Sequence, residues 1–367
     1  MYKTICRPIL FMFDAEFVHN NFILIGRILS FTKLSKLLVP FLVYKNKKLE
    51  QEICGIKFDN PVGLSAGFDK NANIISLMKD IGFGFSEVGS ITNKSCLGNE
   101  KPRVHRLLNE KAIIVNYGLV NDGADKISNK LKNKHFRIPV GINIAKTNDS
   151  NIKKEESVND YFESFRKLKG LGNYITINIS CPNSGDGKSF EDPILLEKLL
   201  KKITTIRKKE TLFLKISPNL DKKRVDKIIF LVRKYKLNGF VISNLTKDRS
   251  KLKEDRKLKY KGGISGSPTR KKSNEMIRYV YEKTKGEFVI VGSGGIFNGT
   301  DAYEKIKNGA NLVQLITGMI YEGPAVIKKI NKELVRLLEG EGYSNISEAV
   351  GKGVKKVNEI NLSRQQH

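Results

Sequence analysis

Short apolar runs alternate, from about residue 60 onward, with longer segments whose apolar residues recur at helical spacing. The runs are rich in Val, Ile and Phe, which is typical of buried parallel strands. We predict eight strands, at residues 62–66, 83–91, 138–144, 174–179, 212–216, 239–242, 288–291 and 312–316. Eight strand–helix units close into a barrel, and the first run lacks the Gly-rich turn of a dinucleotide-binding open sheet. The pattern therefore predicts an α/β fold, a (β/α)8 TIM barrel.

Several helices are marked by residues that cap their first turn. Asp192 with Pro193, and Asp221, precede segments whose apolar residues share one face. Two connections, residues 92–137 and 243–287, are too long for plain crossovers, and both follow the C-terminal end of a strand. Because barrel enzymes carry their active sites at that end, we expect both insertions to cover the site.

The first 45 residues form a small N-terminal helical extension. Asp14 is placed to cap a helix with Phe17, Val18 and Phe22 largely on one side, and a second apolar helix is expected at about residues 34–44. The pair either plugs the barrel floor or lies on a lipid surface. We assign residues 46–351 to the barrel and residues 352–367 to a polar tail expected to be disordered.

The composition narrows the possible partners only slightly. The 367 residues include 66 Lys+Arg against 38 Asp+Glu, a net charge of +28, which suits nucleic acid, an anionic membrane or an acidic substrate, but also fits general surface bias. Charged residues interrupt the one long apolar region, so no membrane-spanning helix or secretion signal is expected. The cysteines form no CxxC pair, which argues against zinc and disulfides and favours a reducing cytosol. They are Cys6, Cys54, Cys96 and Cys181.

Polar residues break into the apolar runs where the strands end. In a closed barrel these ends share one mouth, so the residues are expected to converge there as an active site. They are Asp69 with Lys70, Ser90, Asn143, Asn178 with Cys181 and Asn183, Lys215, Asn244, Gly294 with Gly295, and Thr317.

Three of these features suggest particular chemistry. Gly294 and Gly295, before a helix expected from about residue 300, resemble a phosphate cradle at the barrel's habitual phosphate site. Lys215, within a predicted strand, points into a barrel only if an anionic group such as a reduced flavin meets it; otherwise it is a surface lysine. Asn178 and Asn183 flank Cys181, an arrangement that offers amides to a planar polar ring and a thiol to move a proton. A buried structural cysteine is the alternative.

Several longer motifs resemble those of the dihydroorotate dehydrogenases, particularly the quinone-dependent, membrane-associated class. The resemblance covers about residues 1–351. The motifs are residues 66–70 (AGFDK), 82–90 (GFGFSEVGS), 102–106 (PRVHR), 178–183 (NISCPN), 262–266 (GGISG) and 312–315 (LVQL).

The resemblance implies an FMN enzyme that oxidises dihydroorotate to orotate in pyrimidine synthesis and passes electrons to a membrane quinone. It also implies peripheral attachment to lipid at the cytoplasmic face of the membrane, with no metal and no nucleic acid. Cys181 would be the catalytic base, with His19 and Arg106 near the quinone. The residues expected to hold FMN are Ala66, Gly67, Ser90, Asn143, Asn178, Lys215, Ser243, Ser265, Gly266, Gly294, Gly295, Thr317 and Gly318. The residues expected at the substrate are Lys70, Asn116, Tyr117, Gly118, Leu119, Asn178, Asn183, Asn244 and Leu245.

The chain departs from the family pattern at three substrate-site positions. The quinone class uses a serine base, whereas Cys181 is typical of the soluble classes. Val115 stands where a substrate-binding Asn is expected, with Asn116 next to it, and Leu245 stands where a Thr is expected. Two alternatives therefore stay open: a soluble dihydroorotate dehydrogenase using fumarate or NAD, and a tRNA-binding, flavin-dependent dihydrouridine synthase, which the net charge would suit.

Overall fold

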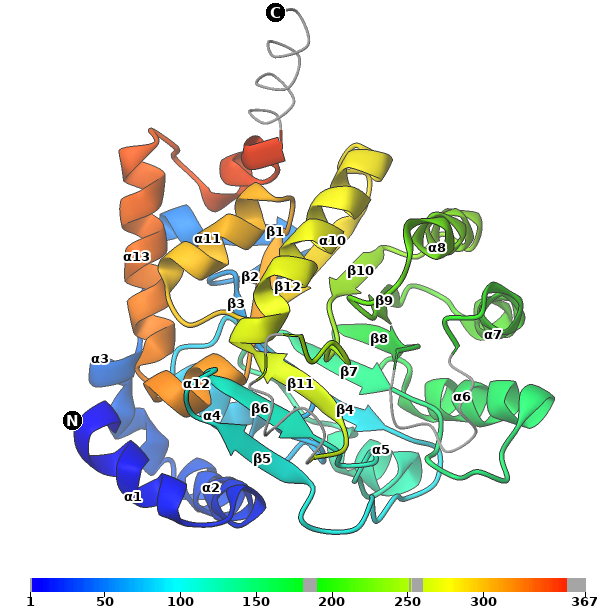
Figure 1. Cartoon of the computed structure of the whole chain (residues 1–367), viewed down its shortest axis with the longest axis horizontal. Coiled ribbons are helices and arrows are strands. Elements are labelled where there is room, and N and C mark those ends of the chain that lie inside the picture. Colours follow the sequence, from blue (N-terminus) through cyan, green and yellow to red (C-terminus); the bar gives the residue numbers. More distant parts are fainter. Residues whose placement is uncertain (1, 181–189, 251, 253–259, 355–367) are drawn as a thin grey trace, which may run out of the picture.

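A closed barrel of eight parallel strands forms the centre of the computed structural model, which describes residues 2–180, 190–250, 252 and 260–354 (Figure 1). Each predicted run overlaps one barrel strand, so the predicted fold is confirmed. In barrel order the strands are β3 (Val62–Leu64), β4 (Phe85–Ile91), β7 (Val140–Ile144), β8 (Tyr174–Asn178), β9 (Thr211–Ile216), β10 (Gly239–Ile242), β12 (Val289–Ser293) and β13 (Leu312–Leu315).

The helices surround the barrel and bury one apolar stripe each against it. The predicted caps are present, because Asp192 accepts hydrogen bonds from the amides of Ile194 and Leu195, and Asp221 accepts one from Arg224. The outer helices are α4 (Ile75–Asp80), α5 (Ala124–Leu131), α6 (Lys154–Leu168), α7 (Pro193–Ile206), α8 (Lys222–Lys234), α10 (Arg270–Thr284), α11 (Gly299–Lys307) and α13 (Val326–Gly340).

A hairpin that the sequence pattern did not reveal closes the barrel floor. It consists of β1 (Gln51–Ile53) and β2 (Ile56–Phe58), and Phe58 packs with Phe85 and Tyr174, the first residues of β4 and β8. Strands of three residues are too short to show a reliable alternation. Because the hairpin fills the floor, the N-terminal helices do not plug it, which removes that alternative.

A second sheet covers the mouth of the barrel. The long insertions supply β5 (Val104–Leu107), β6 (Ala112–Val115) and β11 (Gly263–Gly266), which form an antiparallel sheet with β6 in the centre. Both insertions therefore cover the mouth, as predicted.

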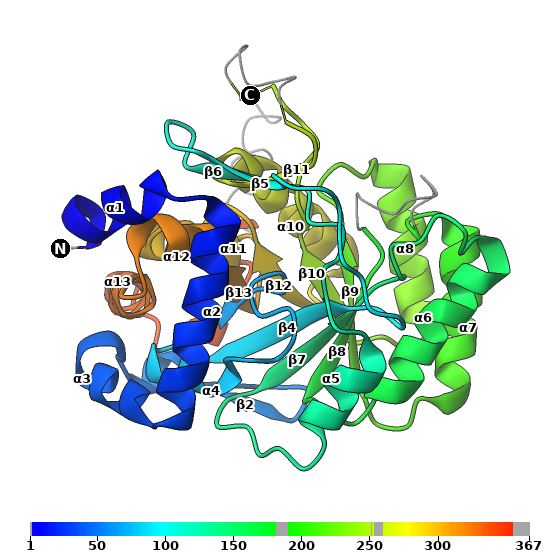
Figure 2. The same ribbon diagram turned by 90° about the horizontal axis from the view of Figure 1, so that it is seen from below.

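The N-terminal unit lies beside this mouth (Figure 2) and differs in part from the prediction. The helix capped by Asp14 is present as α2 (Ala15–Phe31), but an unpredicted π-helical turn (Tyr2–Cys6) and α1 (Arg7–Met12) precede it. The expected second helix is instead a 3-10 turn (Leu34–Leu38) followed by the short α3 (Val39–Leu42). Pro40 explains the break, because it has no N–H group for an interior helical hydrogen bond.

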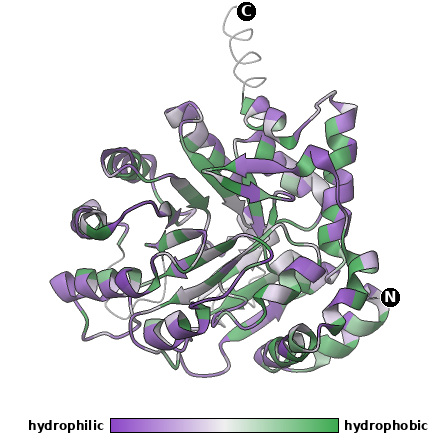
Figure 3. Ribbon diagram, turned by 180° about the vertical axis from the view of Figure 1, so that it is seen from behind, coloured by the Kyte–Doolittle hydropathy of each residue, from purple (hydrophilic) through white to green (hydrophobic). Residues whose placement is uncertain are grey.

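Much of the N-terminal unit's apolar surface faces outward. Of the 17 large hydrophobic side chains exposed in the described chain, 13 lie between residues 5 and 41. Figure 3 shows hydrophobic residues along the helices beside the N-terminus, at the edge of the molecule. Within the described chain no single helix is long and apolar enough to cross a membrane; the helices Tyr2–Met12 and Ala15–Phe31 reach that length only together, across a bend of 116°.

Candidate active site

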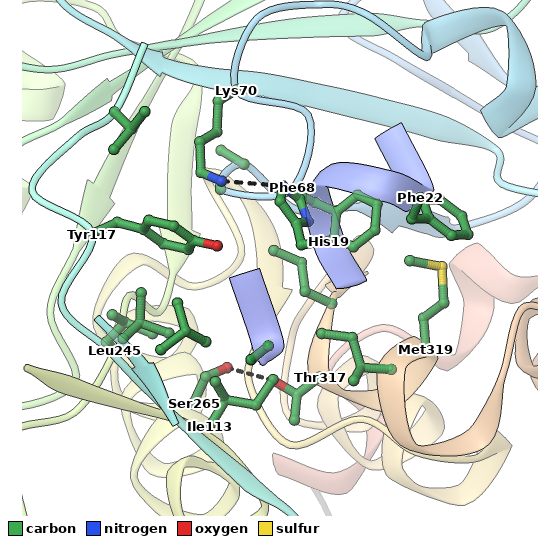
Figure 4. A pocket seen from close by; sticks show the side chains of 18 of the residues that line it. His19, Phe22, Phe68, Lys70, Ile113, Tyr117, Leu245, Ser265, Thr317 and Met319 are labelled. Carbon is green, nitrogen blue, oxygen red and sulfur yellow. Dashed lines mark hydrogen bonds between the residues drawn. The ribbon is translucent and has the colours of Figure 1, made fainter. Parts of the chain in front are cut away.

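A cavity of about 440 Å³ extends from the N-terminal helices to the C-terminal ends of the barrel strands (Figure 4). Its walls are formed by α1 and α2 on one side and by the sheet of β5, β6 and β11 on another, with the C-terminal ends of the barrel strands at the base. Most residues predicted for the site meet here, although they come from distant parts of the chain. They are His19, Ala66, Gly67, Lys70, Ser90, Arg106, Tyr117, Gly118, Leu119, Asn178, Lys215, Asn244, Leu245, Ser265 and Thr317.

A smaller cavity of about 70 Å³ shares Ala66, Lys215, Asn244 and Thr317 with the larger one and is bounded by glycines. Gly294 and Gly295 have φ angles of +106° and +74°, a backbone region that side chains disfavour. A Cβ at Gly294 would lie 2.7 Å from the Thr269 hydroxyl oxygen. Both glycines line the cavity, and their conformation and close packing are those of a glycine loop that could bind a phosphate through its backbone amides.

The same cavity contains polar groups with capacity to bind a ligand. The Ser243 hydroxyl is buried and has no hydrogen-bond partner in the structure, and buried polar groups are normally satisfied. The hydroxyls of Ser265 and Thr317 lie 2.8 Å apart across the cavity (Figure 4), and Gly318 lines it too. Gly266 approaches Thr317 closely, since a Cβ there would lie 2.9 Å from the Thr317 methyl group. Hydroxyls beside a glycine loop fit the phosphate end of a flavin nucleotide.

Amides and hydroxyls form a hydrogen-bonded row across the ends of four strands. Asn178 Nδ2 donates to Ser90 Oγ at 3.0 Å, and Ser90 Oγ donates to Asn143 Oδ1. Asn244 Nδ2 donates to Asn178 Oδ1 at 3.3 Å and to the Ser180 carbonyl at 3.0 Å. The side chains are thus held in fixed orientations at the base of the cavity, where they can recognise the edge of a planar polar ring.

Glu87 anchors this row from inside the barrel, and its role was missed at the sequence level. The carboxylate is fully buried and accepts hydrogen bonds from Asn143 Nδ2 (2.8 Å), Thr176 Oγ1 (2.9 Å) and Gln314 Nε2 (3.1 Å). The available signal was an acidic residue inside an otherwise apolar strand.

Lys70 and His19 connect the barrel to the N-terminal unit. Lys70 Nζ lies 3.1 Å from His19 Nε2 and 3.8 Å from the centre of the Tyr117 ring (Figure 4). Burial lowers the pKa of Lys70 to about 8, and burial together with the charge of Lys70 lowers the pKa of His19 to about 3. His19 is therefore neutral near pH 7 and accepts a hydrogen bond from the Lys70 ammonium through Nε2.

A buried ion pair fixes α2 against the insertion above the mouth. Arg103 Nε and Nη2 bind the two Glu16 carboxylate oxygens at 3.0 and 2.7 Å, and Arg103 Nη1 donates to the carbonyls of Leu97 and Asn99. Arg106 donates to the Phe13 carbonyl at 2.8 Å and lies over the Phe11 ring. Both arginines therefore hold the N-terminal unit to the cover of the cavity.

Residues 48–338 match the family model described as dihydroorotate dehydrogenase. The chain belongs to the dihydroorotate dehydrogenase family. It is 40% identical over 340 residues to dihydroorotate dehydrogenase (quinone) of Christiangramia forsetii, covering 91% of this chain and 99% of that protein. The corresponding protein of Gloeobacter violaceus is 37% identical over 348 residues, covering 95% and 98% of the two chains. A crystal structure of DHODH from Eimeria tenella in complex with ferulenol superposes with a TM-score of 0.82 at 29% identity and covers 92% of this chain and 95% of that one.

Family membership decides between the dihydroorotate dehydrogenase and dihydrouridine synthase alternatives in favour of the former, and this family is flavin-dependent. Among the described residues predicted to bind flavin or substrate, Asn116, Asn143 and Gly266 line neither cavity. Asn143 lies beneath the cavity and orients Ser90. Cys181 and Asn183 lie outside the described residues.

Asn116 requires a correction as a substrate-binding residue. Its side chain turns away from the cavity and accepts a hydrogen bond from Asn99 Nδ2 at 3.1 Å. Side chains alternate along β6 and its extension, so Ile113, Val115 and Tyr117 face the cavity and residue 116 faces the other side. An amide at position 116 therefore does not replace one at position 115, and this wall of the cavity is apolar.

Proposed function

We propose that this protein oxidises (S)-dihydroorotate to orotate in pyrimidine biosynthesis, with FMN as cofactor and a membrane quinone as electron acceptor. The observation that carries the proposal is the cavity that joins the amide row at the strand ends to the apolar N-terminal helices. A polar oxidation site at one end and an apolar entrance at the other suit a polar substrate and a lipid-soluble acceptor. The relatives named dihydroorotate dehydrogenase (quinone) support the same reaction.

The glycine loop and hydroxyls suit FMN. Gly294 and Gly295 would bind the phosphate through backbone amides, with Ser265 and Thr317 beside them. Lys215 is buried in both cavities and would balance negative charge on the ring system. The flavin, when bound, supplies the two-electron acceptor for the substrate.

The substrate would bind at the amide row. Asn178 and Asn244 are already oriented there, and the Lys70 ammonium would attract the carboxylate of dihydroorotate. Asn183 would complete the amide set, and the Cys181 thiolate would take the proton from the substrate carbon. Val115 and Leu245 would contact the substrate through apolar surface only.

The N-terminal unit would bind both quinone and lipid. Tyr2, Phe11, Val18 and Phe22 line the outer part of the cavity, while His19 and Arg106 offer polar groups to a quinone oxygen. Exposed apolar side chains would enter a peripheral lipid surface at the cytoplasmic face, and nearby lysines would attract anionic headgroups. These are Lys33, Lys36, Lys45, Lys47 and Lys48.

The deciding experiment is anaerobic addition of dihydroorotate to the purified flavoprotein. We expect loss of the oxidised-flavin absorbance with formation of one orotate per flavin. Reoxidation is then measured with a short-chain quinone, fumarate and NAD offered separately, and we expect the quinone to be fastest. No bleaching would contradict the substrate, whereas bleaching followed by reoxidation only with fumarate or NAD would contradict the acceptor.

A further inference from the structure

Lys305 is an unusual charge in the interior of the protein. It lies on α11 with no exposed surface, and its Nζ donates to Asn274 Oδ1 at 2.7 Å and to Ser273 Oγ at 3.0 Å. Both partners are neutral. The nearby Asp301 carboxylate is occupied by Arg270 at 2.8 Å, and no ion pair found among the described residues includes Lys305. Burial lowers the pKa of Lys305 to about 7, although the charges of Glu304 and Asp301 raise it. An anion bound nearby would stabilise the ammonium and offset part of the cost of burying it.

The hydrogen bonds of Lys305 lead directly to the glycine loop. Ser273 Oγ, which accepts from Lys305, donates at 2.6 Å to the carbonyl of Ser293. Ser293 is the last residue of β12 and precedes Gly294. Because the C=O and N–H of a trans peptide point in opposite directions, fixing this carbonyl toward α10 directs the Gly294 N–H away from α10.

The smaller cavity lies in front of this loop, and Lys305 lies behind it. Ser293, Gly294 and Gly295 line the cavity, whereas Lys305 does not. The Lys305 side chain packs behind β12, where a Cβ at Gly292 would lie 3.3 Å from its Cδ. Figure 1 shows α10 and α11 on the outside of the barrel beside β12. The Lys305 ammonium contacts Ser273 and Asn274 of α10, so it lies on this outer side of the loop and not in the cavity.

We propose that Lys305 is a positioning residue for the flavin phosphate. It holds Ser273 and the Ser293 carbonyl so that the Gly294 amide faces the phosphate, and it places a positive charge behind the loop to attract that dianion. The proposal rests on the phosphate site in the proposed function. Its specific consequence is that Lys305 contributes to binding of the phosphate and not to binding of the isoalloxazine ring.

The test compares two ligands that differ only in the phosphate. Flavin is removed from the full-length protein, and the dissociation constants of FMN and riboflavin are measured by flavin fluorescence for wild type and for Lys305→Met. We expect FMN binding to weaken by about tenfold or more, while riboflavin binding changes by less than about twofold. The matched control is Lys307→Met on the same helix, since Lys307 pairs with Glu341 at the surface and should affect neither ligand.

Ser273→Ala provides a second test if Lys305→Met fails to fold, which thermal unfolding without flavin would reveal. Removal of the hydroxyl leaves the Ser293 carbonyl with only the hydrogen bond from the Ser243 amide at 3.2 Å and breaks its link to Lys305, so FMN binding should weaken selectively again. The role of Lys305 would be overturned if a folded Lys305→Met bound FMN as tightly as wild type, or if it lost affinity for FMN and riboflavin equally. If Lys305→Met does not fold, unchanged FMN binding in Ser273→Ala would overturn it. If the wild-type protein bound riboflavin as tightly as FMN, the proposed phosphate site would be wrong. Both its assignment under the proposed function and the role of Lys305 would then be rejected.

Discussion

At the scale of single residues, Glu87 orients Asn143 from inside the barrel. Each of its carboxylate oxygens accepts from an amide NH₂ group, one from Asn143 and the other from Gln314. Glu87→Gln therefore brings an NH₂ group against a donor in either orientation and loses at least one buried hydrogen bond. We expect the free energy of unfolding to fall by about 2 kcal/mol and flavin to be retained less well. Urea unfolding and flavin content check this, with the exposed Glu156→Gln as control. A variant as stable as wild type would show that the contacts of Glu87 contribute little.

Cys181 is the residue proposed to act on the substrate proton. Cys181→Ala should keep FMN but slow anaerobic flavin reduction by about 10²–10⁴-fold, the usual contribution of a general base. Cys181→Ser should retain partial activity with its optimum at higher pH, because an alcohol is a weaker acid than a thiol. Stopped-flow absorbance measures both rates. Near-normal reduction in the alanine variant would remove Cys181 from the mechanism.

At the scale of elements, the Glu16–Arg103 pair determines how firmly α2 is attached to the cover of the cavity. Both side chains are less than one-tenth exposed. Glu16→Gln leaves the Arg103 charge buried without its partner, so we expect a loss of about 3 kcal/mol in unfolding free energy and faster proteolysis of α2. In the double variant with Arg103→Gln the loss should be smaller than the sum of the single losses, and strict additivity would argue against the coupling.

The same pair predicts acid sensitivity. Burial alone would raise the pKa of Glu16, but the hydrogen bonds and charge of Arg103 lower it overall. A carboxyl group whose pKa is lower in the folded state contributes its full stability above its unfolded value of about 4.3 and loses it as the pH falls through the folded value. Unfolding free energies measured from pH 6 to pH 3 should therefore fall less steeply for Glu16→Gln than for wild type. Parallel curves would contradict this assignment.

At the scale of the whole molecule, the outward apolar face of the N-terminal unit predicts lipid binding. Phe31 and Phe41 are 90% and 74% exposed. Replacing both with Ser should weaken cosedimentation with anionic vesicles by at least about tenfold, since each ring loses roughly 2 kcal/mol of burial. Flavin reduction by dihydroorotate should stay unchanged. Phe230→Ser with Ile194→Ser, on exposed sites of the barrel helices, is the control, and equal effects of the two pairs would reject a specific lipid face.

The sequence alone determined the barrel and most of the residues that meet in the larger cavity. Local sequence pattern reveals features that depend only on neighbouring residues. These features include the strand runs, the helix caps Asp192 and Asp221, and the glycines before α11. In a closed barrel of eight parallel strands, all the C-terminal strand ends must lie at the same mouth.

Only the tertiary structure decided which side chains meet. The contacts of Glu87 with Gln314, of Lys70 with His19, and of Lys305 with Ser273 join residues that are 227, 51 and 32 positions apart. The direction of the Asn116 side chain likewise depended on which alternate residues of β6 and its extension face the cavity. Local sequence fixes backbone conformation and the buried face of each element, whereas the partner of a buried polar group depends on how those faces pack together.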